Sequence, residues 1–545
     1  MKAALAFTAS AGIATLLLGA VTPTQAAPLT SSTSAPKAAS PNVCVDTNIR
    51  QALVGAVPGQ LLAPPQDVTA ASQIQGGSLF RVAYATTGEA GSVQATCGLI
   101  AVPDAPAIKG VVAWAHGTVG LNEQCQPSMN PARFVGPMYA GIGAVSANGS
   151  QQDGALYSLL QDGFAVTATD YFSAGMGSPN FQQYVLGVPS GLAVIDSARA
   201  LTGNADEFGL APVSPNAQLP LLTWGHSQGG GSALWAGQLA REYLAAMGDQ
   251  TLDLAGVAAE APASQFTTSP GQPDAYLGLH LGDRDMYNMN PGLLVNGLPI
   301  PFPIGVALFS FVTTSWSQVT DGTAGAFPFG PTQSVSYQDV LTPSGATTAP
   351  RIAALCLNAS GLPGIAAAAT PYLAPDLKRF FASPFGGSKS SGSWKGGIDA
   401  TCDDPSSQPQ AFQDWCAWLQ FNMPGPNGVN PYSKIPVDNS GDKVPVYIAQ
   451  GLNDRIIWCV DTEGQVQGTR CLTDQLFHSF EDEYCDGSGY LQADYFPGAS
   501  HLSLPGAAAT NPSTGDFDGS PLEEFIGGAM NGTLAPQCIA DDADG

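Results

Sequence analysis

The stretch Leu219-Pro-Leu-Leu-Thr-Trp-Gly-His-Ser-Gln-Gly229 decides the fold of this chain. Its first part, Leu219–Trp224, is apolar and uncharged, as is typical of a buried parallel strand. Apolar residues then recur at helical spacing over residues 230–247. A serine, Ser227, stands at the turn between this strand and this helix. The order predicts a nucleophile elbow, where small glycines let strand and helix approach. A glycine- and serine-rich loop before a helix is the alternative.

Further apolar runs alternate with helical patterns along the chain, and a helix is expected at Leu192–Leu201. The expected strands are a hairpin within Ser78–Pro103, then Gly110–Ala115, Phe164–Thr169, Leu219–Trp224, Leu254–Glu260, Val444–Gln450 and Tyr490–Phe496. This alternation implies a largely parallel sheet with helices on both faces. With the elbow, it predicts the α/β class and an α/β-hydrolase fold with a mostly parallel central sheet.

The alternation breaks over residues 263–443, which predicts a large lid or cap insertion over the active site. It would divide the hydrolase core into a first part, 44–262, and a C-terminal part, 444–545. A second structural domain without a catalytic role is the alternative. An apolar segment at 291–312 contains prolines at 299, 301 and 303. These prolines argue against a transmembrane helix, so no stable membrane span is expected.

The N-terminal residues predict export from the cell. Met1-Lys2 and the apolar residues 3–20 have the pattern of a secretory signal peptide, with cleavage expected near Ala27. Residues 28–43 are rich in Ser, Thr, Ala and Pro and predict a disordered lead-in. Ten cysteines, an even number, then favour disulfide bonds in a secreted, extracellular protein. Their pairing cannot be deduced from spacing.

Charge excludes two classes of partner. The chain has 43 acidic and 18 basic residues, and its net charge is −25. Phosphate backbones and anionic membrane surfaces repel such a chain, so no nucleic-acid partner is expected. Solubility outside the cell accounts for the acidic surplus.

A serine nucleophile needs a base, and the base needs an acid that fixes its tautomer. In an α/β-hydrolase the chain order is serine, acid, histidine, at the ends of successive strands. The chain contains five histidines: His116, His226, His280, His478 and His501. His501 lies in a loop directly after the last expected strand, and Asp454 follows the strand before it. We therefore expect Ser227, Asp454 and His501 to form a catalytic triad. A surface-loop histidine and an ordinary turn aspartate are the alternatives.

The reaction also needs backbone N–H donors for the oxyanion. One is expected from Gln228, the residue after the nucleophile. The other is expected from the loop His116-Gly117-Thr118, which follows an earlier strand, with Thr118 as the donor. Asp170, at another strand end, is either a brace of this site or an ordinary turn residue.

These residues together resemble the secretory lipase family, the yeast lipase A type of α/β-hydrolase, over about Ser78–Leu504. The motifs that carry the resemblance are Asp170-Tyr171 with Gly175, Gly177, Tyr184 and Gly187, the helix at 190–200, QG-x-x-D at 450–454 and PG-x-x-H at 497–501. The resemblance implies an extracellular carboxylic ester hydrolase with a lid and no metal or other cofactor. It implies the same triad and the same oxyanion donors, Gln228 and Thr118. Its partner would be an ester or lipid substrate, met during transient contact with a lipid interface.

Two other functions fit the same residues. A secreted serine aminopeptidase of this fold would need an acidic cluster in the cap, for which Asp283 and Asp285 form a close pair. A non-catalytic binding module on a hydrolase scaffold is the other, and an intact triad argues against it.

Overall fold

The computed structural model describes residues 42–45, 48–88, 91–136, 142–143, 150–171, 181–267, 294–295, 298–299, 304–319, 322–323, 325–358, 361–369, 402, 404–454, 456–457, 459–460 and 470–540. All of them belong to a structural unit that spans residues 41–545. The expected signal peptide, nearly all of the lead-in, His280 and the Asp283/Asp285 pair lie outside the described residues.

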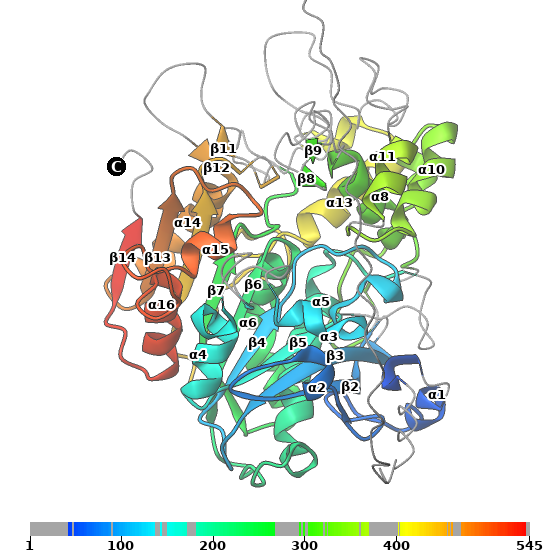
Figure 1. The fold of residues 1–545 in the computed structure, drawn as a ribbon. Coiled ribbons are helices and arrows are strands. Elements are labelled where there is room, and N and C mark those ends of the chain that lie inside the picture. Colours follow the sequence, from blue (N-terminus) through cyan, green and yellow to red (C-terminus); the bar gives the residue numbers. More distant parts are fainter. Residues whose placement is uncertain are drawn as a thin grey trace, which may run out of the picture. The chain divides into compact units, whose positions relative to one another are not determined.

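A ten-stranded sheet forms the centre of this unit, with the order β1-β2-β3-β5-β4-β6-β7-β10-β13-β14 (Figure 1). Its strands are β1 (Gln66–Asp67), β2 (Gly77–Thr87), β3 (Val93–Pro103), β4 (Val111–Ala115), β5 (Ala165–Thr169), β6 (Leu219–His226), β7 (Leu252–Glu260), β10 (Val446–Gly451), β13 (Tyr490–Phe496) and β14 (Gln537–Ala540). In the part of the sheet with the order β5-β4-β6-β7-β10-β13-β14, each strand pairs in parallel with its neighbours. The pairs at the β1 edge, up to β3 with β5, are antiparallel. Every strand expected from the sequence is present, and the predicted fold class is confirmed.

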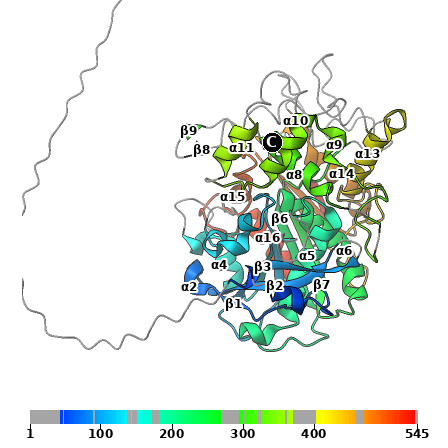
Figure 2. The same ribbon diagram turned by 90° about the vertical axis from the view of Figure 1, so that its right-hand side faces the viewer.

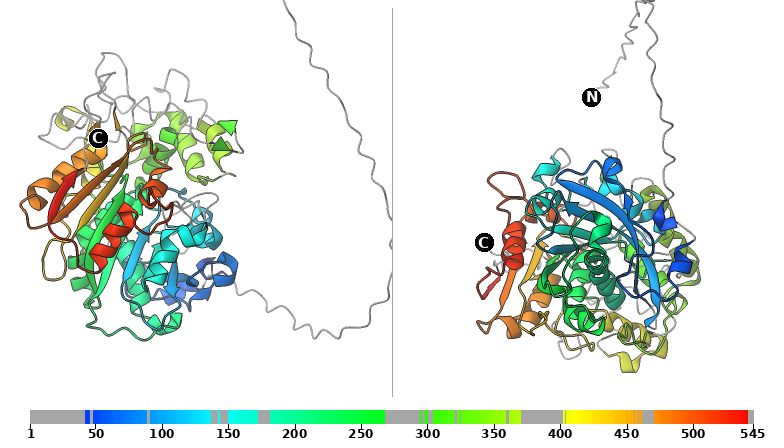
Figure 3. Two further views of the ribbon diagram at one scale, coloured as in Figure 1. Left: turned by 60° about the vertical axis from the view of Figure 1, so that its left-hand side comes forward. Right: turned by 90° about the horizontal axis from the view of Figure 1, so that it is seen from below.

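Helices cover both faces of the sheet. The helices are α1 (Ile49–Ala52), α2 (Thr69–Ser72), α3 (Pro131–Phe134), α4 (Ala155–Gln161), α5 (Gly187–Thr202), α6 (Gln228–Ala246), α8 (Ile304–Trp316), α9 (Tyr337–Val340), α10 (Pro343–Ala353), α11 (Leu362–Ala369), α13 (Gln410–Phe421), α14 (Leu472–Tyr484), α15 (Leu504–Ala508) and α16 (Pro521–Met530). Neighbouring positions of β7 show the two layers, because successive residues of a strand point to opposite faces. A Cβ built on Gly256 would meet Ala529 of α16, whereas a Cβ built on Gly237 of α6 would meet the Val257 side chain. Figure 3 shows α16 in red across the sheet.

Helices α8, α10, α11 and α13 come from the segment expected to form the cap. They gather at one end of the sheet in Figures 1 and 2. Two antiparallel pairs of short strands lie outside the central sheet. In the segment expected to form the cap, β8 (Leu294–Val295) pairs with β9 (Leu298–Pro299). In a later segment, β11 (Cys459–Val460) pairs with β12 (Arg470–Cys471). Within the described residues, no helix has both the length and the hydropathy needed to cross a bilayer.

Four disulfide bonds connect distant parts of the described chain. They are Cys44–Cys97, Cys125–Cys356, Cys402–Cys416 and Cys485–Cys538. Cys471 is also disulfide-bonded. The described part of the chain has no free cysteine, so the disulfides expected from the even cysteine count are confirmed.

Candidate active site

Ser227 occupies the turn between β6 and α6 with a strained backbone. Its φ is 60° and its ψ is −120°, a conformation that costs a non-glycine residue about 1–3 kcal/mol. Surrounding main-chain hydrogen bonds hold it there. The Ser227 N–H donates to the Glu260 carbonyl at 2.9 Å, and the Ser227 carbonyl accepts from Ala263 at 2.9 Å and Gly231 at 3.1 Å. These bonds therefore keep Ser227 in a non-helical conformation directly before the first residue of α6.

Two glycines make this turn sterically feasible. A Cβ built on Gly229 would lie 1.8 Å from the carbonyl oxygen of Ala115 in β4. One built on Gly225 would lie 2.4 Å from the Gly229 carbonyl oxygen. No side chain fits at such distances, so the close approach of α6 to the sheet requires glycine at both positions.

His501 and Asp454 form one hydrogen-bonded chain with Ser227. The Nε2 atom of His501 lies 2.8 Å from Ser227 Oγ, and its Nδ1 atom lies 2.7 Å from Asp454 Oδ2. All three residues are buried, although 47 and 274 positions of sequence separate His501 from its two partners. Asp454 directly follows the short turn after β10, and His501 follows β13. Parallel strands β10 and β13 are neighbours, which brings the ends of both strands to one place.

The Asp454 carboxylate is oriented by groups other than His501. Its Oδ1 atom accepts the backbone N–H groups of Ile456 at 2.8 Å and Ile457 at 2.9 Å. Its Oδ2 atom also accepts from the Gln450 side-chain amide at 3.3 Å. These donors leave Oδ2 facing the imidazole, in the arrangement that fixes a histidine tautomer.

His226, a residue to which sequence reasoning gave no role, packs directly on this chain. Its ring centroid lies 4.5 Å from that of His501. Burial first, and then the neighbouring His501, hold the pKa of His226 well below its usual value. His226 is therefore an uncharged ring that covers one side of His501. Its position inside the elbow indicates that it lies near Ser227, but its contact with the His501 ring depends on tertiary structure.

The two expected oxyanion segments flank the serine. Gln228 is the first residue of α6, so its N–H has no acceptor within the helix. A Cβ built on Gly117 would lie 3.6 Å from the Ser227 Cβ, which puts the loop His116–Thr118 beside the nucleophile. The Thr118 hydroxyl oxygen lies 2.7 Å from the Tyr184 hydroxyl.

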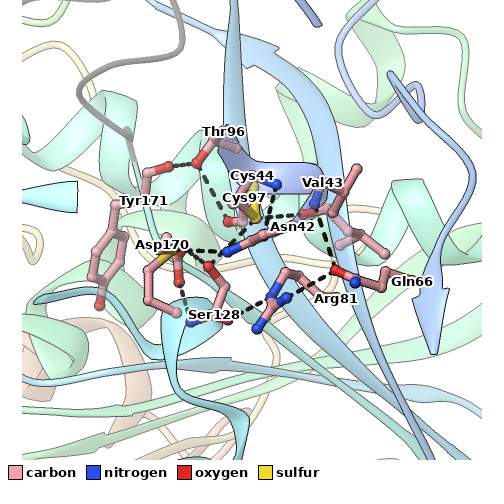
Figure 4. The surroundings of a disulfide bond; sticks show 12 residues. Asn42, Val43, Cys44, Gln66, Arg81, Thr96, Cys97, Ser128, Asp170 and Tyr171 are labelled. Atoms are coloured by element: carbon pink, nitrogen blue, oxygen red, sulfur yellow. Dashed lines mark hydrogen bonds between the residues drawn. A yellow bond between two sulfur atoms is a disulfide. The ribbon is translucent and has the colours of Figure 1, made fainter. Parts of the chain in front are cut away.

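Asp170 is a buried anchor rather than an exposed turn residue. Its carboxylate accepts the Ser128 backbone N–H at 3.1 Å and the Ser128 hydroxyl. Arg81 Nε donates to the Ser128 carbonyl at 2.7 Å. Burial raises the pKa of Asp170 to about 6, although the Ser128 bonds favour the ionised form. Figure 4 shows this cluster beside the Cys44–Cys97 disulfide.

Glu260, at the end of β7, carries the second unusual carboxyl group. Its carboxyl accepts the Trp224 indole N–H at 2.9 Å, and burial raises its pKa to about 8. The backbone carbonyl of Glu260 accepts the Ser227 N–H, so this residue lies next to the elbow. With a pKa of about 8, its side-chain carboxyl is mostly protonated and uncharged at neutral pH.

The other two histidines that the structure describes, His116 and His478, are not part of the hydrogen-bonded chain around Ser227. His478 is exposed on α14, where Nδ1 lies 2.5 Å from Glu481. His116 is buried, and burial lowers its pKa to about 4. Within the described residues, no group of three or more His, Cys, Asp or Glu side chains could hold a metal ion.

Part of the chain matches a known protein family. Residues 145–274 match the family described as "Secretory lipase", and this segment contains the elbow. The resemblance to secretory lipases is confirmed. The match supports a lipase or esterase function, with lipids or esters as the class of substrate. Among curated proteins, none matches the chain.

Solved structures with the same fold include lipase A from Candida antarctica. In its closed state that lipase is 15% identical, with a TM-score of 0.53 and coverage of 92% of this chain and 87% of that chain. A second structure of the same lipase gives a TM-score of 0.50 at 15% identity, covering 93% and 90%. The rice cell wall degrading esterase LipA from Xanthomonas oryzae is 16% identical, with a TM-score of 0.47 and coverage of 82% and 93%. The likeness to lipase A shows the fold.

Proposed function

We propose that this protein is a secreted serine carboxylic ester hydrolase, a lipase or esterase that works through an acyl-enzyme on Ser227. The observation that carries the proposal is the continuous chain from Ser227 Oγ through His501 to Asp454, with both links at hydrogen-bonding distance. A serine so linked to an imidazole and a buried carboxylate is an activated nucleophile.

In the first half-reaction, Ser227 Oγ attacks the ester carbonyl carbon while His501 Nε2 takes the hydroxyl proton. The carbonyl electrons move to the oxygen, and the N–H groups of Gln228 and Thr118 stabilise the resulting oxyanion. Asp454 stabilises the imidazolium. When the tetrahedral intermediate collapses, His501 returns the proton to the alcohol that leaves, and the acyl group stays on Ser227.

In the second half-reaction, water attacks the acyl-enzyme with His501 as its base. The oxyanion forms again in the same hole, and its collapse breaks the bond to Ser227 Oγ. The carboxylic acid is released and the serine recovers its proton. No step requires a metal or another cofactor.

Secretion and the lid are further parts of the proposal. The disulfide bonds among the described residues fit an oxidising, extracellular location, as does the N-terminal sequence pattern. We infer that the segment 263–443 forms a lid, because its described helices gather at one end of the sheet (Figure 1). The aminopeptidase alternative depends on Asp283 and Asp285, which lie outside the described residues.

Replacement of the nucleophile tests the proposal. Ser227→Ala should lower kcat for short p-nitrophenyl esters by about 10⁵- to 10⁶-fold, because the attacking oxygen is lost. It should also abolish covalent labelling by a fluorophosphonate. Ser479→Ala is a suitable control, because Ser479 is a partly buried serine of α14 that only donates to the Leu476 carbonyl. Wild-type turnover by the Ser227→Ala variant would refute the proposal, and labelling of neither protein would favour the binding-module alternative.

A further inference from the structure

Two tyrosine hydroxyls reach the oxyanion loop from opposite ends of one sequence stretch. Tyr171 Oη donates to the His116 carbonyl at 2.5 Å, and Tyr184 Oη lies 2.7 Å from Thr118 Oγ1. Both rings are buried. The two tyrosines belong to the motif that begins at Asp170-Tyr171, and no residue of this motif takes part in the reaction proposed above.

Tyr171 connects the loop to the helix that carries the other oxyanion donor. Its ring packs on the His116 ring with 4.5 Å between centroids. Its hydroxyl also interacts with the Ser232 side chain, which donates to the Gln228 carbonyl at 2.9 Å. Tyr171 adopts a φ of 59°, a strained value that its surroundings must maintain. The Tyr171 phenol therefore lies between the loop His116–Thr118 and the first turns of α6.

Tyr184 is held by the helix α8 of the proposed lid. Its backbone N–H donates to Ser315 Oγ at 2.8 Å, and its carbonyl accepts the Trp316 indole N–H at 2.8 Å. Its ring meets Phe311 edge-on, with centroids 5.7 Å apart. These three contacts fix the direction of the phenol, because they restrain both its backbone and its ring.

The direction of the Tyr184–Thr118 hydrogen bond follows from chemistry. Burial raises the pKa of both tyrosines above the ordinary value, so both phenols keep their protons across the working pH range. A phenol is a stronger donor than an aliphatic hydroxyl, and a buried tyrosine O–H needs an acceptor. The distance between the two oxygens is compatible with either direction, and in the arrangement that we infer, Tyr184 donates to Thr118 Oγ1. The Thr118 hydroxyl then keeps its own proton for another acceptor.

We propose that Tyr171 and Tyr184 are positioning residues that clamp the oxyanion loop, and that the Thr118 hydroxyl is a third donor to the oxyanion. This proposal rests on the proposed ester hydrolysis. Tyr171 fixes the loop through the His116 carbonyl, and Tyr184 orients the Thr118 hydroxyl. The hole then has two backbone donors, from Gln228 and Thr118, and one side-chain donor.

Four variants test the clamp, with a fifth as matched control. Tyr171→Phe and Tyr184→Phe each remove one hydroxyl, Thr118→Val removes the third donor, and Thr118→Ser retains it. Tyr484→Phe is the control, because Tyr484 is a buried phenol that donates to the Val444 carbonyl at 2.8 Å, before the start of β10. Active sites are titrated with a fluorophosphonate, so that kcat is obtained per competent site. The inhibition constant of a trifluoromethyl ketone, which forms a hemiketal oxyanion with a serine, is measured alongside.

We expect kcat per active site to fall about 100-fold in Thr118→Val, as for the loss of one oxyanion donor. Tyr171→Phe and Tyr184→Phe should each lower it about tenfold, because the donors remain but are less well placed. The KM should change little, and the inhibition constant of the ketone should rise by the same factor as kcat falls. Thr118→Ser should stay within about threefold of wild type, and Tyr484→Phe should match wild type.

The clamp would be overturned if both tyrosine variants kept the wild-type kcat per active site and only lost thermal stability, as expected for Tyr484→Phe. Tyr171 and Tyr184 would then have a purely structural role. Equal kcat in Thr118→Val and Thr118→Ser would overturn the third donor. Failure of the wild-type protein to hydrolyse any ester would refute the proposed function instead, and this outcome is visible before any variant is compared.

Discussion

The elbow and the proposed oxyanion loop, His116–Thr118, meet at the same serine, yet they are held in different ways. The elbow is fixed by main-chain contacts: the Ser227 N–H donates to the Glu260 carbonyl, and Gly229 lies against Ala115. The loop is fixed by side chains, the hydroxyls of Tyr171 and Tyr184. Main-chain contacts tolerate many sequences but demand glycine at the closest approach. Side-chain contacts demand particular residues far away in the sequence.

This difference decides what a short sequence motif can reveal. The steric requirements of the elbow lie within five consecutive residues, so the elbow can be recognised as a string. The loop depends on tyrosines that lie more than fifty residues downstream of it. Nothing in the residues 116–118 themselves indicates those partners.

Among the variants that test this comparison, the largest effect is expected at Asp454, where main-chain N–H groups orient the side chain that we propose as the catalytic acid. Asp454→Asn should lower kcat for short esters by about 10⁴-fold, because the amide favours the wrong tautomer of His501. Thermal stability should change much less than activity. The matched control is Asp442→Asn, since Asp442 is exposed and precedes β10. A loss below tenfold in the Asp454 variant, measured by initial rates, would mean that another acid serves His501.

A methyl group added to the elbow should break its main-chain contacts. Gly229→Ala would put a Cβ 1.8 Å from the Ala115 carbonyl oxygen, so β4 and α6 must separate. We expect the free energy of unfolding to fall by about 3 kcal/mol or more. Urea denaturation at one pH measures this.

Gly527→Ala is the matched control for that change. Gly527 is also helical, in α16, but its Cβ would meet only the Glu523 carboxylate at 3.3 Å. Alanine there should be neutral or stabilise by up to about 1 kcal/mol. If both variants had the same stability, the close approach at Gly229 would not be what holds the elbow.

The last prediction concerns pH, which should act on the elbow side through Glu260. Burial raises the pKa of Glu260 from 4.5 to about 8. Between these values the folded protein binds a proton at Glu260 that the unfolded chain has released, so the contribution of Glu260 to stability falls as pH rises, by up to about 1.4 kcal/mol per pH unit. Glu260→Gln should remove this contribution from the slope of stability against pH, measured by urea titrations from pH 5 to 8. An exposed control, Glu242→Gln, should keep it, and an unchanged slope in the Glu260 variant would contradict the assignment.

Much of the sheet could be predicted because its strands are short, apolar runs between helical patterns. The weakest pattern belongs to β14, four residues with partly or fully exposed side chains at the sheet edge, and this strand was not expected. Helix α5 begins at Gly187, before the expected Leu192, because Pro189 is tolerated in a first helical turn.

The candidate site was predictable to the extent that chain order and strand ends define it. The structure brings Ser227, Asp454 and His501 into one hydrogen-bonded chain, and their catalytic roles stay a prediction. The tilted contact of the His226 ring with the His501 ring and the raised pKa of Glu260 could not be predicted. Both depend on which side chains face each other across parallel strands and loops, and periodicity does not contain that information.

The Cys125–Cys356 disulfide has a consequence for handling the protein. It joins two residues 231 positions apart, and Ser227 lies between them. The polypeptide from one cysteine to the other is thus a covalent ring that contains the nucleophile. A single protease cut anywhere in that ring leaves the pieces attached, so a nicked sample has the mobility of one chain on a gel without reductant. Reductant is therefore needed before the integrity of a preparation can be judged by mass.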